Sequence, residues 1–191
     1  MVLPLKDTMP AARAPVVTLA LVVVGALVFA VVGEGGWIAP GGVLMAALTL
    51  LVLWIFGATL EDTLGRATYV VLFGLGAAVA VTVVALAGGG ATAAIAGVSG
   101  AVSAVLGAYV ALYPRGRVLS AAFVVLFFTM LELPALLLAA VWWAAHIGIV
   151  ALAGADAVTV LAPLGGFGLG LAAARSLARP RLIAPAPYRV A

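Results

Sequence analysis

Long runs of hydrophobic residues, separated by short polar breaks, dominate the chain. A transmembrane α-helix needs about 20 mostly apolar residues in a row. Five segments meet or nearly meet this length, and a sixth is rich in glycine but uncharged. The six segments are residues 16–32, 40–57, 67–87, 93–113, 134–153 and 158–174. The pattern predicts an all-α, polytopic membrane protein with six transmembrane helices.

One further apolar stretch, residues 118–131, has only 14 residues. We expect it to be a re-entrant or interfacial segment, because it is short for a full crossing. With six crossings, all nine Lys and Arg residues fall on one side of the membrane, and a seventh crossing would move the four C-terminal arginines to the other side. Basic residues in short loops mark the cytoplasmic side. We therefore predict that both termini are cytoplasmic.

The same pattern divides the chain into three parts. We expect a cytoplasmic segment over residues 1–15, a membrane domain over 16–178 and a short, proline-containing cytoplasmic tail over 179–191. Basic residues precede the first apolar run, as in a signal peptide. No small-residue cleavage pattern follows promptly and five more apolar segments do, so we expect the first helix to be uncleaved.

Composition supports a membrane location and limits the chemistry. Hydrophobic residues make up 67% of the chain, charged residues 8%, and the mean hydropathy is +1.38, whereas soluble domains are about half apolar and a quarter charged. The net charge of +3 comes from residues in the breaks, so we expect membrane lipids and no nucleic acid as partners. With no cysteine, a single histidine and scattered carboxylates, we expect no metal or organic cofactor.

The fourth predicted helix begins Gly97-Val98-Ser99-Gly100 and continues with small residues along two stripes. The stripes are Gly100, Ala104 and Ala108, and Ser103, Gly107 and Ala111. Small residues let the backbones of membrane helices approach closely. A GxSG sequence alone therefore indicates tight packing.

Four further stretches surround this one in a fixed order. They are residues 3–7 with Pro10 and residues 15–18; residues 56–66; residues 131–135 with Trp142; and Gly165-Gly166-Phe167 with Gly170. Together with the GxSG helix they resemble the rhomboid family of intramembrane serine proteases over nearly the whole chain. The resemblance implies a six-helix rhomboid-like bundle in the plasma membrane of a prokaryote, in which Ser99 takes the position of the nucleophile.

Rhomboids cleave peptide bonds within the membrane with a serine and a histidine. The family histidine lies in an Ala-His-x-Gly-Gly-Phe phrase of the sixth helix, and this chain has Pro163 at that position. A serine hydroxyl needs a base to take its proton, and the proline side chain cannot accept one. The resemblance therefore implies a nucleophile position without its usual base.

The second helix departs from the family pattern as well. Family members carry a His-x-x-x-Asn whose side chains help to hold the oxyanion, and Met45 and Thr49 stand at those two positions. An earlier family histidine is replaced by Pro40. The donors that would stabilise a tetrahedral intermediate are thus absent or shortened, and losing one such donor costs about a hundredfold or more in turnover.

His146 is the only histidine, and the phrase Ala145-His146-Ile147-Gly148 superficially resembles the family's histidine motif. It could be a relocated base. Its place in the fifth predicted helix favours a structural or gating histidine held by a neighbouring polar group, and ligand binding is a third interpretation. An ionisable residue at membrane depth is a candidate functional residue by default.

Two functions remain for this sequence. The first is a non-catalytic pseudoprotease that binds transmembrane partners, with Ser99 present but not activated. The second is an active intramembrane endopeptidase with Ser99 as nucleophile and His146 as base. A transporter or channel is disfavoured, because no charged residue lies centrally in a predicted span. Glu61 and Asp62 are expected to cap or hydrogen-bond a cytoplasmic helix junction.

Overall fold

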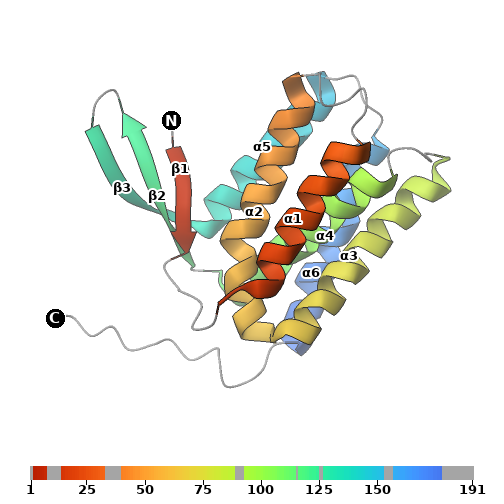
Figure 1. The fold of residues 1–191 in the computed structure, drawn as a ribbon, viewed down its shortest axis with the longest axis horizontal. Helices are drawn as coiled ribbons and strands as arrows, with labels where there is room; N and C mark the ends of the chain where they lie inside the picture. The colour runs from red at the N-terminus through yellow and green to blue at the C-terminus, as the bar shows by residue number, and fades with distance from the viewer. Residues whose placement is uncertain are drawn as a thin grey trace.

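The computed structural model describes residues 2–7, 14–32, 40–88, 93–114, 116–124, 127–152 and 157–177. Its helices form a bundle and are α1 (Val16–Val32), α2 (Pro40–Leu64), α3 (Arg66–Leu86), α4 (Ala93–Leu112), α5 (Ala135–Leu152) and α6 (Val158–Leu177) (Figure 1). Four of them, α2, α3, α4 and α6, are long and apolar enough to cross a membrane, whereas α1 and α5 are apolar over shorter lengths. The prediction of a helical membrane bundle is confirmed.

Helix α4 is the central helix of the bundle. It contacts α1, α2, α3, α5 and α6, and 72% of its span is buried, against 28% for α3 and for α6. Its small residues allow this enclosure. A Cβ atom on Gly166 of α6 would collide with the carbonyl oxygen of Gly100, and one on Gly170 would collide with that of Ala104. The small-residue stripes predicted for the fourth helix are therefore sites of backbone contact.

Two described basic residues, Arg66 and Arg175, lie at one end of the bundle. Gly65, with φ of 80°, alone separates α2 from α3, a left-handed conformation that favours glycine. The main-chain N–H of Ala135 donates to the carbonyl of Gly116 at 2.8 Å, which brings the start of α5 beside the end of α4. Arg66 opens α3 and Arg175 lies in the last turn of α6. We call this end, where α2 and α4 finish and α3 and α5 begin, the basic end.

A small sheet lies to one side of the bundle, beside α2 (Figure 1). It is antiparallel in the order β1 (Val2–Asp7), β2 (Arg117–Val124) and β3 (Phe127–Pro134). The expectation of an all-α chain therefore holds for the bundle but not for this sheet. The described part of residues 118–131, for which we expected a re-entrant or interfacial segment, forms two paired strands. The hairpin is rich in β-branched and aromatic residues, which favour strands, and it pairs with the amino-terminal residues.

One helix boundary also differs from the sequence-based expectation. The second helix was expected to end at residue 57, but α2 continues to Leu64. Most of the stretch over residues 56–66 is therefore helical. Residues 33–39, between the first two predicted helices, and residues 178–191, which include the expected tail, lie outside the described residues.

Candidate active-site region

Ser99 lies in the first half of α4, directly before Gly100, and is 5% exposed. One turn later, the hydroxyl of Ser103 donates to the carbonyl oxygen of Ser99 at 2.8 Å. That bond occupies Ser103 within its own helix. Within the described part of the chain, no hydrogen bond involves the hydroxyl of Ser99. Ser99 is thus a buried residue of the central helix, and no described base is bonded to its hydroxyl.

Pro163 lies in α6 and is buried. Helices α4 and α6 run in the same direction, because Gly166 packs on Gly100 and Gly170 packs on Ala104, four residues further along both helices. With a helical rise of about 1.5 Å per residue, this register puts Pro163 within one turn of Ser99 along the bundle axis. The structure therefore brings Ser99 and Pro163, which the resemblance puts at the family's base position, to the same level.

His146 lies on α5 and is 2% exposed. Its ring packs against Trp142 and Trp143, with centroid distances of 5.2 Å and 5.8 Å. Its Nε2 lies 3.4 Å from the carbonyl oxygen of Thr159 on α6, and its Nδ1 has no hydrogen-bond partner among the described residues. The ring therefore makes no hydrogen bond to Ser99, and the pair needed by the second functional hypothesis is not joined in this structure.

The two positions expected to support an oxyanion lie on α2. Thr49 is fully buried, and its hydroxyl has no hydrogen-bond partner within the described ranges. Met45 is partly buried and packs against the main hydrophobic core. Of the two, only Thr49 offers a polar hydrogen, and that hydrogen is not directed to Ser99 by any hydrogen bond in the described structure.

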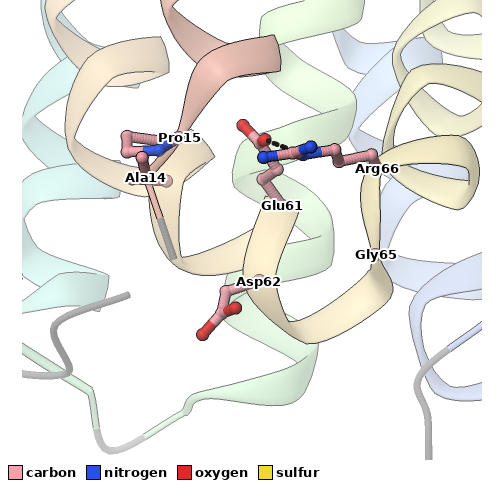
Figure 2. Close-up of a pocket in the computed structure, with 7 residues that line it drawn as sticks. Ala14, Pro15, Glu61, Asp62, Gly65 and Arg66 are labelled. Carbon is pink, nitrogen blue, oxygen red and sulfur yellow. Dashed lines mark ion pairs between the residues drawn. The ribbon is translucent and has the colours of Figure 1, made fainter. Parts of the chain in front are cut away.

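A separate polar cluster lies at the basic end, where Figure 2 shows a pocket and the ion pair between Glu61 and Arg66. The pocket is lined by Ala14, Pro15, Ala58, Glu61, Asp62, Gly65 and Arg66. The carboxylate of Glu61 accepts the main-chain N–H of Thr18 at 2.8 Å and the Thr18 hydroxyl at 2.9 Å. It also lies 3.4 Å from Nε of Arg66.

This cluster is a helix junction. The first N–H groups of an α-helix have no partners within the helix, and a negative charge there is favourable. Glu61 supplies both an acceptor and a charge from α2, while the side chain of Asp62 points away from it (Figure 2). The structure places Glu61 in the junction role expected from the sequence. Thr18, its partner, was not singled out from the sequence, because no local pattern reveals a contact between two separate helices.

Fold and site together define a polytopic helical membrane protein with a serine buried in its central helix. A family model described as "Rhomboid domain" matches residues 39–180, most of the chain, and the chain belongs to the rhomboid family. Comparison with curated proteins and with solved structures gives no match. Membership makes the chain an integral membrane protein that sits in lipid. Family membership alone does not establish catalysis, because one fold can host different functions.

Proposed function

We propose that this chain is a rhomboid-like pseudoprotease, which keeps the family scaffold and binds transmembrane partners without cutting them. The observation that carries this proposal is Pro163 at the position of the family's base, at the same level as Ser99. Nucleophilic catalysis needs a base within hydrogen-bond reach of the hydroxyl. The absence of any hydrogen bond to the Ser99 hydroxyl in the described residues supports the same interpretation.

The two positions expected to support the oxyanion also favour a pseudoprotease. Met45 has no polar hydrogen, and the Thr49 side chain is shorter than the amide side chain that the family resemblance implies there. Loss of one oxyanion donor typically costs about 100–1,000-fold in turnover. Losses at the base and at the oxyanion site together favour a role that does not need chemistry.

We also propose that the protein lies in the plasma membrane of a prokaryote and crosses it six times, with both termini in the cytoplasm. The basic end would then face the cytoplasm, in keeping with the bias of Lys and Arg towards that side. The partners would be proteins with transmembrane helices, the class of molecule that the rhomboid scaffold receives. Such partners would share the bilayer with the bundle.

The test uses purified protein in liposomes with a single-span reporter substrate. We expect no cleavage above the level of Ser99→Ala. Cleavage by the wild type that Ser99→Ala abolishes would overturn the pseudoprotease proposal. Crosslinking of the reporter helix to the intact chain in the same liposomes tests binding separately: a crosslink without cleavage is expected, and the absence of both would reject partner binding by this class.

The second candidate is an active endopeptidase with Ser99 as nucleophile and His146 as base. One observation favours it: Nδ1 of His146 is buried and has no partner among the described residues, so in the neutral ring it could accept a proton. It would require Nδ1 to come within about 3 Å of the Ser99 hydroxyl. Cleavage lost in both Ser99→Ala and His146→Ala, but kept in Trp142→Phe, would support this candidate.

A further inference from the structure

Pro163 leaves a main-chain carbonyl without its usual partner. Helix α6 runs unbroken from Val158 to Leu177 with this proline inside it. In an α-helix each N–H donates to the carbonyl four residues earlier, and proline has no N–H to donate. The carbonyl that loses its donor here is that of Thr159. In a bilayer such a loss is costly unless another group takes the place of the missing donor.

The side chain that reaches this carbonyl is His146. Its Nε2 lies 3.4 Å from the Thr159 oxygen, at the long end of the hydrogen-bond range. A carbonyl oxygen only accepts, so Nε2 must carry the hydrogen. In membrane proteins, neighbouring helices often satisfy the backbone groups that a proline releases. The single histidine of the chain therefore meets the carbonyl that Pro163 sets free.

We infer that His146 donates a hydrogen bond to the Thr159 carbonyl in place of the N–H that Pro163 lacks. This hydrogen bond, which we call the tie, joins α5 to α6. The role of His146 is then to satisfy a backbone group and hold two helices together. This inference does not rest on the proposed pseudoprotease function. It concerns the tie alone and holds or fails whether or not the protein cleaves a substrate.

Packing around the ring supports the tie. Trp142 and Trp143 flank the imidazole, and the ring of Trp143 meets Phe167 of α6 edge-on at 5.7 Å. The two tryptophans contact the histidine within α5, and Trp143 in turn contacts α6. Contacts of α5 with α4 and α6 are otherwise sparse beside the extensive contact between α4 and α6. A hydrogen bond at this place therefore adds a polar contact between α5 and α6 to these ring contacts.

A double-mutant cycle tests the dependence of one residue on the other. We expect His146→Phe, which keeps a ring but removes the donor, to lower the melting temperature in detergent by about 2–4 °C. In a Pro163→Ala background, the new main-chain N–H at position 163 satisfies the Thr159 carbonyl, and the same change should shift the melting temperature by less than about 1 °C. Equal shifts in the two backgrounds would overturn the inference, because packing losses are common to both.

A second measurement reads the histidine directly. His146 is the only histidine, so protein labelled with ¹⁵N-histidine reports one ring by NMR in micelles. We expect the tautomer with hydrogen on Nε2, and loss of this fixed preference in Pro163→Ala. A ring protonated at Nδ1 alone in the wild type would contradict the donation to Thr159. Neither the melting temperature nor the NMR spectrum depends on substrate cleavage. A negative result in either measurement is therefore distinct from failure of the proposed function.

Discussion

The carboxylate of Glu61, near the end of α2, accepts the main-chain N–H of Thr18 at 2.8 Å and its hydroxyl at 2.9 Å. The same carboxylate accepts the N–H of Val17 at 3.2 Å. Glu61 is 4% exposed, so water does not replace these bonds easily. One side chain thus closes the amino end of α1 and fixes it to the basic end of the bundle.

This relationship predicts that Glu61→Ala destabilises the protein by about 2–4 kcal/mol, because buried donors left without partners cost about 1–3 kcal/mol each. Reversible unfolding in mixed micelles measures the loss. Glu61→Gln keeps one accepting oxygen and should fall between the wild type and Glu61→Ala. A loss below about 0.5 kcal/mol for Glu61→Ala would reject the capping role.

Backbone contact between α4 and α6 predicts that alanine substitutions at two glycines of α6 have different effects on stability. Gly166→Ala places a Cβ against the Gly100 carbonyl, and overpacking of this kind typically costs about 1–3 kcal/mol. A Cβ on Gly168 would meet nothing within 4 Å, so Gly168→Ala should be neutral or up to about 1 kcal/mol more stable. Melting temperatures in detergent compare the two variants. Similar losses at both positions would mean that close helix approach is not the cause.

The absence of cysteine from the chain allows a direct test of topology. Ala14, Ala87 and Ala157 are exposed and lie before α1, after α3 and before α6. If six helices cross with both termini inside, Ala87→Cys and Ala157→Cys should react with an impermeant maleimide on intact cells. Ala14→Cys should react only after the cells are opened. Failure of Ala157→Cys to react from outside, while Ala87→Cys does, would show that α5 does not cross.

Ser99 should contribute little to stability, because its hydroxyl makes no hydrogen bond in the described structure. We expect Ser99→Ala to change the free energy of unfolding by less than about 1 kcal/mol, as measured in the same micelles. Ser99→Leu is the contrasting change, since extra volume in the central helix should cost about 1–3 kcal/mol. A large loss for Ser99→Ala would reveal a bond to the hydroxyl and weaken the view that the serine is unused.

Local signals allowed most of the bundle to be predicted. Apolar runs of span length identify membrane helices without knowledge of their neighbours, and the small residues around Gly100 and Gly166 indicated close packing. The hairpin of β2 and β3 was not predicted, because a short apolar run carries no sign of its pairing partner. That partner, β1, lies more than a hundred residues away in the chain.

The candidate site was likewise predicted only in part. Ser99 and Pro163 were identified by their motifs, and the register of α4 and α6 brings them to one level. For His146 the sequence indicated only that a neighbouring polar group would hold it. The structure shows that this group is the Thr159 carbonyl, because α5 packs beside α6 at this point. The sequence does not show which helix lies next to the carbonyl oxygen that loses its donor to a proline.

The central claim, that Ser99 has no base, is tested most directly by labelling with a serine-reactive fluorophosphonate in native membranes. The account predicts that the wild type labels no more than Ser99→Ala, and that Pro163→His, which restores an imidazole at the level of Ser99, increases labelling of Ser99. Labelling of the wild type that disappears in Ser99→Ala would contradict the account and show that a base reaches the serine.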